Sequence, residues 1–123
     1  MAGMDNTLAP TLAVRDAAAA IDYYRQAFGA TELSRYREGG RIVHADLSVG
    51  GSEFAVKDAD DVDPAPDGAV PVILVLRLPD VDAVWRRALD AGGTEVFPLN
   101  DHEYGRMGRI ADPFGHRWIL AAA

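Results

Sequence analysis

The order of apolar and polar positions along the chain predicts two helices and eight strands. The first half gives a helix at about 16–28 and strands at about 8–14, 31–37, 41–49 and 52–57. The second half gives a helix near 80–91 and strands near 70–78, 94–99, 105–111 and 116–121. Each half is therefore βαβββ. A four-stranded sheet with one helix has only one covered face, so we expect its other face to need a partner.

The two halves repeat the same signals at their helix ends. Asp16 and Asp80 precede the helices at an offset of 64 residues (80 − 16) and are expected to be N-caps. Gly29 and Gly92 follow the helices at an offset of 63 (92 − 29) and suit left-handed C-caps. We therefore predict a single domain, residues 1–123, built from modules at about 8–57 and 70–121. A linker at 58–69, rich in Asp, Pro and Gly, joins them and is expected to lie in solvent.

Gly50-Gly51 predicts a two-residue hairpin, because both central positions of a type I′ turn need positive φ. Counting outward from this turn, three pairs face the helix: Val49 with Ser52, Leu47 with Phe54, and Ala45 with Val56. The opposite face then pairs His44 with Lys57, Asp46 with Ala55, and Ser48 with Glu53. Such a polar face is typical of either a cleft lining or a solvated surface.

The sequence Asp-Pro-Phe-Gly at 112–115 predicts a second hairpin, since proline and glycine suit the second and fourth positions of a type I turn. Its register places Ile110 opposite Trp118 on the core face. The other face carries Arg109 opposite Ile119 and Ala111 opposite Arg117. An error of one residue would exchange the two faces.

Composition narrows the possible partners and compartments. The formal net charge of −7 argues against a general affinity for nucleic acid, which requires a basic surface. No apolar run reaches the roughly 18–20 residues of a membrane span, and the first residues do not resemble a signal peptide. The absence of cysteine excludes disulfides, thiolate metal sites and a cysteine nucleophile. We expect a cytoplasmic protein.

Three stretches resemble the vicinal oxygen chelate superfamily, which includes glyoxalases, bleomycin-resistance proteins and dioxygenases. They are LAVRDAAAAIDYYRQAFGA at 12–30, RIVHADLSVG at 41–50 and GRIADPFGHRW at 108–118. The last two resemble the glyoxalase-like branch associated with phosphonate operons. The resemblance covers nearly the whole chain. It implies an α+β fold in which two βαβββ modules pair into a curved sheet around a cleft, often in a homodimer.

Metal-dependent members of that superfamily hold their metal ion with His, Gln or Glu side chains on four strands. On the same resemblance, the four ligand positions fall on Ala9, near Ala55, on Ile73 and on Ile119. None of these side chains can bind a metal ion. A catalytic metal site needs several donor atoms on one ion and one coordination position left open. We therefore expect no metal cofactor, with a divalent metal as the alternative.

His44 and Asp46 lie two residues apart on one predicted strand and therefore share a face. With Glu53 nearby, they could rebuild a metal site, or His44 could act as a general acid or base near neutral pH. The simpler interpretation is that they form hydrogen bonds in the cleft wall and orient a ligand. We take all three as candidate ligand-binding residues, with His44 as the one candidate for catalysis.

Arg109 and Arg117 flank the former ligand position at Ile119 and could hold an anionic or carbonyl-bearing ligand. The alternative is that they pair with Asp46 or Glu53 as structural support. Tyr104 lies in the predicted loop at the cleft mouth, after His102, which we expect in solvent. The aromatic residues Tyr23, Tyr24, Phe28, Phe54, Trp85 and Trp118 are assigned to the core or to a dimer interface, and one of the adjacent tyrosines is expected at an edge or a partner subunit.

The functional prediction is the binding of a small organic molecule, an antibiotic or a metabolite, in a metal-free cleft of a homodimer. A concave, partly apolar pocket with a few polar groups is the expected form of such a site. Two alternatives stay open: a metal-dependent lyase or dioxygenase with substitute ligands around His44, and a purely structural or regulatory partner.

Overall fold

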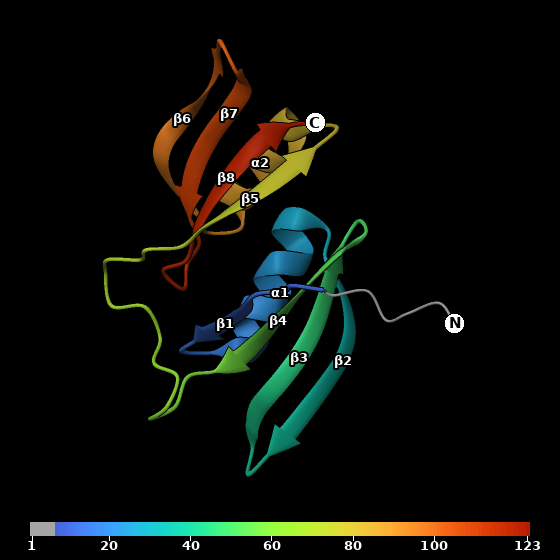
Figure 1. The fold of residues 1–123 in the computed structure, drawn as a ribbon, viewed down its shortest axis with the longest axis vertical. Helices are drawn as coiled ribbons and strands as arrows, with labels where there is room; N and C mark the ends of the chain where they lie inside the picture. Colours follow the sequence, from blue (N-terminus) through green and yellow to red (C-terminus); the bar gives the residue numbers. More distant parts are fainter. Residues whose placement is uncertain (1–6) are drawn as a thin grey trace.

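The computed structural model describes residues 7–123 as two successive βαβββ modules (Figure 1). The N-terminal module contains β1 (Thr11–Val14), α1 (Ala17–Phe28), β2 (Thr31–Glu38), β3 (Arg41–Val49) and β4 (Ser52–Asp58). The C-terminal module contains β5 (Ile73–Leu78), α2 (Val81–Asp90), β6 (Thr94–His102), β7 (Gly105–Ala111) and β8 (Arg117–Ala122). All ten predicted elements are present, and the predicted α+β fold is confirmed.

Each module forms its own four-stranded mixed sheet. The strand orders are β1-β4-β3-β2 in the N-terminal sheet and β5-β8-β7-β6 in the C-terminal sheet. In each sheet the first strand pairs in parallel with the last strand of its module, and the other neighbours are antiparallel. Both hairpin registers predicted from the turns are confirmed, with Asp46 opposite Ala55 and Arg109 opposite Ile119.

Helix α1 is held at its N-terminus by two carboxylates. Asp16 accepts a hydrogen bond from the Ala19 amide (3.1 Å), as predicted for an N-cap. Asp58, at the end of β4, accepts one from the Ala17 amide (2.8 Å) and a second from the Ile42 amide (2.8 Å). These bonds tie the helix start to two strands. At the other end Gly29 adopts the left-handed conformation (φ 68°), as predicted.

Helix α2 confirms one cap prediction and corrects the other. Asp80 caps its N-terminus through the Ala83 amide. Its C-cap, however, is Ala91 in the right-handed conformation, and Gly92 follows with φ 121°. The prediction of a left-handed Gly92 cap was wrong because the helix ends one residue earlier than expected. None of the helices in residues 7–123 is long and apolar enough to cross a membrane.

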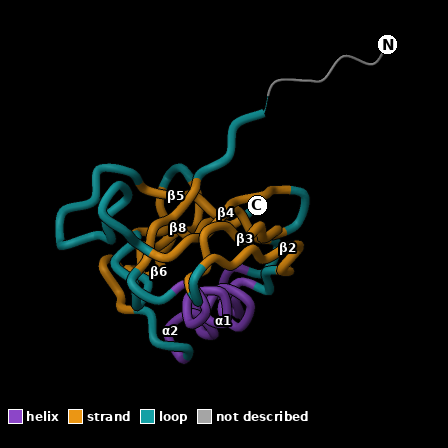
Figure 2. Tube along the Cα trace, turned by 90° about the horizontal axis from the view of Figure 1, so that it is seen from below, coloured by secondary structure: helices purple, strands orange, loops and turns teal. Residues whose placement is uncertain are grey.

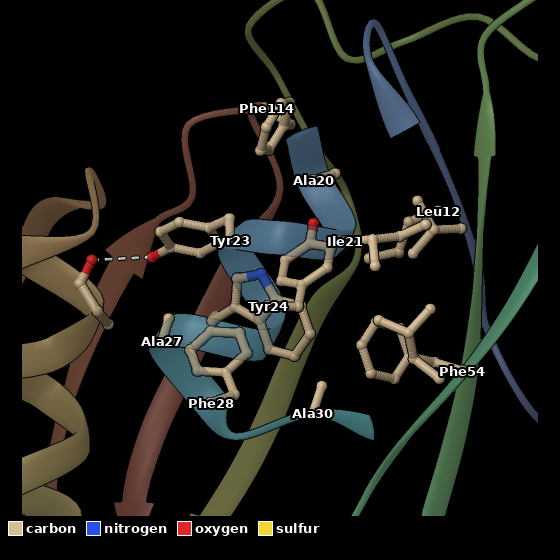
Figure 3. Close-up of a cluster of buried hydrophobic side chains, with 14 of the residues drawn as sticks. Leu12, Ala20, Ile21, Tyr23, Tyr24, Ala27, Phe28, Ala30, Phe54 and Phe114 are labelled. Carbon is tan, nitrogen blue, oxygen red and sulfur yellow. Dashed lines mark hydrogen bonds between the residues drawn. The ribbon is translucent and has the colours of Figure 1, made fainter. Parts of the chain in front are cut away.

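The two helices lie side by side on one side of the molecule, and the strands of both sheets lie on the other (Figure 2). One continuous core connects the modules. In Figure 3, Tyr24 points toward Phe54 within the core, whereas Tyr23 points toward α2 and donates a hydrogen bond to the Ala88 carbonyl (3.0 Å). Both tyrosines are buried, so the expectation that one would lie at an edge was wrong. Tyr23 is buried by the contact between the two helices.

Asp112 is the buried polar residue at the centre of the module contact. Its Oδ2 accepts hydrogen bonds from the Tyr24 hydroxyl (2.6 Å) and the Trp118 indole N–H (2.9 Å). Its Oδ1 accepts two more from the Phe114 and His116 amides (2.9 and 3.0 Å). Burial, and then the Asp112 charge, raise the pKa of Tyr24 well above its usual value, so the hydroxyl keeps its proton and donates. This carboxylate therefore links α1 to the turn between β7 and β8.

Candidate functional site

Each sheet has one face against its helix and a second face, called here the open face, that points away from the helices. In the N-terminal sheet, Leu47 and Phe54 face α1 and are buried. Their strand neighbours Asp46 and Ala55 therefore belong to the open face. In the C-terminal sheet, Trp118 and Leu120 are buried, so Ile119 belongs to the open face. Because both helices lie on the same side, both open faces point to the opposite side (Figure 2).

On the open face of the N-terminal sheet, the structure brings together His44, Asp46 and Ser34. The His44 Nε2 atom is 2.8 Å from Asp46 Oδ1. The Ser34 hydroxyl donates to Asp46 Oδ2 at 2.7 Å. Hydrogen bonds from Ser34 and then from His44 lower the pKa of Asp46. Asp46 is therefore ionised near neutral pH and uses both oxygen atoms, while the His44 side chain keeps 44% of its surface accessible.

The predicted pairing of His44 with Lys57 does not form. A register shift between Tyr36 and Arg37 marks an irregularity where β2 meets β3, and the pairing of β3 with β4 begins only at Ala45. Lys57 instead binds Asp60 (2.9 Å) and Asp63 in the linker. The linker is thus partly held down by an ion-pair network. His44 has Tyr36 beside it, with ring centroids 6.2 Å apart.

Glu53 stays opposite Ser48, as predicted, and is exposed at the β3–β4 hairpin. It lines a groove of about 580 Å³ between this hairpin and β5. Arg77 of the C-terminal module lines the same groove, with Phe54, Leu76 and Trp118 providing apolar walls. The groove is a partly apolar space to which both modules contribute.

The open face of the C-terminal sheet is more apolar and carries three arginines. Ile73, Val75 and Phe97 are substantially exposed there, next to Arg77, Arg109 and Arg117. The Arg109 guanidinium lies 5.7 Å from the centre of the Phe97 ring, in cation–π geometry. Within residues 7–123, neither Arg109 nor Arg117 forms an ion pair with Asp46 or Glu53. The structural-support interpretation therefore finds no such pair within the described part of one chain.

Tyr104 lies at the tip of the β6–β7 hairpin and is three-quarters exposed. The expected loop at 101–104 is shorter than predicted, because β6 continues to His102 and leaves only two turn residues. The Tyr104 ring stacks on His102 with centroids 5.1 Å apart and an interplanar angle of 2°. Arg106 fixes the hairpin to α2 through two hydrogen bonds with Asp82 (2.8 and 3.1 Å). Tyr104 and Arg109 share a depression of about 310 Å³ with Phe97 and Met107.

The six predicted site residues thus form two groups within one chain. His44, Asp46 and Glu53 belong to the N-terminal sheet, and Tyr104, Arg109 and Arg117 belong to the C-terminal module. Sequence reasoning missed Ser34, Tyr36 and Phe97. The turn Gly39-Gly40 between β2 and β3 was a partial signal: counting outward from it places Arg35 opposite His44, and the register shift between Tyr36 and Arg37 puts Tyr36 there instead.

Comparison with known proteins identifies the family. Residues 6–120 match the family model described as the glyoxalase/bleomycin resistance protein/dioxygenase superfamily. The chain belongs to this superfamily. The uncharacterized protein Mb0911c of Mycobacterium bovis is 44% identical, over 95% of this chain and 83% of that protein.

Two solved structures resemble this chain over nearly its whole length. TioX from Micromonospora sp. ML1 is 28% identical with a TM-score of 0.76, covering 95% of this chain and 98% of TioX. The Arabidopsis thaliana gene product At5g48480 is 28% identical with a TM-score of 0.75, covering 96% of this chain and 99% of that one.

The metal site expected for a metal-dependent superfamily member does not fit this chain. Ala55, Ile73 and Ile119 lie on the open faces, and Ala9 precedes β1; their side chains are alkyl groups without donor atoms. Within residues 7–123 no three His, Cys, Asp or Glu side chains are grouped so that they could hold a metal ion. His44 and Asp46 supply two donors, and Asp46 already accepts two hydrogen bonds. Within the described part of the chain, a substitute site around His44 therefore has two protein donors, fewer than a metal site uses.

Proposed function

We propose that this superfamily member binds a small organic molecule without a metal ion, between the open face of an N-terminal sheet and the open face of a C-terminal sheet. The proposal depends on the side chains at the four positions that hold the metal ion in metal-dependent superfamily members. They hold alkyl side chains, while the polar groups around them, His44, Asp46, Arg109 and Arg117, remain. An apolar floor with a few polar groups at its margin is the usual composition of a small-molecule site.

A homodimer supplies the second wall of this cleft. The two open faces of one chain point the same way, so they do not face each other (Figure 2). The N-terminal open face carries Asp46 and Glu53, whereas the C-terminal open face carries Arg77, Arg109 and Arg117. A second copy related by a twofold axis would place each acidic face against a basic one and form two equivalent clefts. This arrangement also covers the exposed apolar side chains of both faces.

The ligand class follows from the groups on the two walls. Arginines beside an aromatic ring favour a planar anion, because a guanidinium binds carboxylates in a two-pronged geometry and stacks on flat groups. His44 on the opposite wall offers a nitrogen to a hydroxyl or another polar hydrogen. We therefore propose an organic anion with a planar apolar part. We also propose that the chain belongs to the branch of the superfamily associated with phosphonate operons. The motifs at 41–50 and 108–118 support this placement.

Isothermal titration of the full chain with a panel of aromatic and aliphatic carboxylates, antibiotics and metabolites tests this function. We expect saturable binding of at least one planar anion. Arg109→Gln or Arg117→Gln should raise the Kd of that anion about tenfold, because each variant loses one hydrogen bond from a charged group. Arg86→Gln is the matched control, because Arg86 is exposed on α2, on the helix side of the molecule. The absence of saturable binding across the panel would refute the proposal.

Metal analysis of the purified protein separates this function from a metal-dependent lyase or dioxygenase. We expect titration with Zn²⁺, Ni²⁺, Mn²⁺ or Fe²⁺ to leave the ligand affinity unchanged. A stoichiometric, tightly held metal ion that ligand binding requires would show that other residues form a metal site, and the metal-free proposal would fail.

A further inference from the structure

We propose that His44 is a general base that removes a proton from a bound carbon acid, held in position by Asp46 and Ser34. This activity goes beyond ligand binding: it makes the open face of the N-terminal sheet a site of metal-free proton transfer. It depends on the proposed function only in that the natural substrate would occupy the same cleft.

Hydrogen bonding fixes which ring nitrogen of His44 is basic. Asp46 Oδ1 is 2.8 Å from His44 Nε2, and an ionised carboxylate offers only lone pairs. Nε2 must therefore carry the hydrogen atom in the neutral ring, which leaves the lone pair on Nδ1. After Nδ1 takes a proton, Nε2 still donates its hydrogen atom to Asp46. The carboxylate–histidine pair is the arrangement that enzymes use to hold a histidine base in one tautomer.

Ser34 keeps the carboxylate in place. Its hydroxyl donates to Asp46 Oδ2 at 2.7 Å, so both oxygen atoms of Asp46 have partners and the plane of the carboxylate is fixed. Ser34 and Asp46 come from neighbouring strands that pair directly in the register of β2 with β3. Asp46 and Ser34 are thus positioning residues, which act through His44.

The groups around His44 leave the base accessible. Its side chain is 44% exposed on the open face, and the flanking aromatic ring is that of Tyr36 from β2. The nearest cation on the open face of β4, Lys57, is turned toward Asp60 and Asp63. Helix α1 lies against the opposite face of the sheet and contributes no charged group here. Within residues 7–123, Asp46 is therefore the carboxylate that lies within ion-pair distance of the His44 ring.

The proposed step balances without a further reactant. His44 Nδ1 takes a proton from a carbon next to a carbonyl group, and the electron pair of the C–H bond moves to the carbonyl oxygen to give an enolate. Return of the proton to the same carbon on its other face, or to the neighbouring position, gives an epimer or an isomer.

A reaction with a synthetic carbon acid tests the base without knowledge of the substrate. In 5-nitrobenzisoxazole, a base removes the ring C–H proton, the electron pair forms the nitrile, the N–O bond breaks and a coloured nitrophenolate is released. We expect His44→Gln to lower the rate by about a hundredfold, in the range of general-base effects, and Asp46→Asn by a smaller factor. His102→Gln is the control, because the exposed His102 stacks on Tyr104 and forms no ion pair with a carboxylate within residues 7–123. Equal rates for the wild-type chain and His44→Gln would overturn the proposal.

Nitrogen NMR of the free protein provides a second, substrate-independent measurement. Long-range proton–nitrogen correlations distinguish a ring with hydrogen on Nε2 from one with hydrogen on Nδ1. We expect neutral His44 to hold its hydrogen on Nε2 in the wild-type chain and to populate both tautomers in Asp46→Asn. A hydrogen on Nδ1 in the wild-type chain would refute the assignment. Anion binding with an inactive His44 would reject this inference alone, whereas an active His44 without anion binding would reject the proposed function alone.

Discussion

At the scale of single residues, Asp112 is the polar group on which the packing of the two modules depends. Its four partners are all donors: two side chains, of Tyr24 and Trp118, and two backbone amides. A carboxylate matches this environment because both of its oxygen atoms accept hydrogen bonds. An asparagine of the same shape would place an NH₂ group against donors, so the charge is required as well as the volume.

We therefore predict that Asp112→Ala lowers the free energy of unfolding by about 3 kcal/mol or more, because it leaves the buried Tyr24 hydroxyl and Trp118 N–H without acceptors. Urea denaturation of the full chain measures this loss. Asp63→Ala is the control, since Asp63 forms an exposed ion pair with Lys57 and should cost less than about 1 kcal/mol. Similar losses for the two variants would contradict this account of Asp112.

At the scale of secondary-structure elements, the start of α1 is coupled to the sheet beneath it by Asp58. One carboxylate oxygen accepts from the first amide of the helix, at Ala17, and the other from Ile42 near the start of β3. Asp16 adds a second acceptor two residues further along the helix, at Ala19. Two negative groups at a helix N-terminus also interact favourably with the helix dipole.

From this arrangement we predict that Asp58→Ala lowers the free energy of unfolding by about 2 kcal/mol, since two backbone amides lose their acceptor. Thermal and urea unfolding both report the change. Asp61→Ala is the matched control: Asp61 is an exposed acidic residue in the same segment, and its replacement should change stability by less than about 0.5 kcal/mol. If Asp58→Ala is no less stable than Asp61→Ala, the coupling of α1 to the sheet through Asp58 is wrong.

At the scale of the whole molecule, the two open faces determine how copies of the chain would assemble. They lie on one side, carry opposite charges and expose apolar residues, among them Val75, whose exposed fraction is 52%. A charge placed at Val75 would be buried without a partner in the proposed dimer, and burying an unpaired charge is costly.

Accordingly, sedimentation velocity should find the wild-type chain as a dimer and Val75→Asp as a monomer with an unchanged circular dichroism spectrum. Val62→Asp introduces the same charge in the linker, at a side chain that is 84% exposed, and should leave the dimer intact. A wild-type chain that stays monomeric at every concentration would refute the twofold assembly and, with it, the second wall of the cleft.

Local signals account for the parts of the fold that were predicted correctly. The Gly50-Gly51 turn and the Asp-Pro-Phe-Gly turn each fix a register, because a hairpin's turn length determines which residues oppose one another. The faces of Asp46 and Ile119 followed directly from that counting. Where the chain departs from regular pairing, the counting failed. Ile42 and Ala45 are both buried beside the irregularity between β2 and β3, and the pairing of β3 with β4 begins at Ala45, one residue after His44.

The ten elements, the two-module repeat and the hairpin registers could be predicted from the sequence, since each depends on residues close together in the chain. Which distant groups meet follows from the packing of the folded chain. It joined Ser34 to the His44–Asp46 pair, turned Lys57 to the linker, buried Asp112 under Tyr24 and placed both open faces on one side. These contacts depend on bulges, helix packing and the relative position of two sheets, which no local pattern of residues specifies.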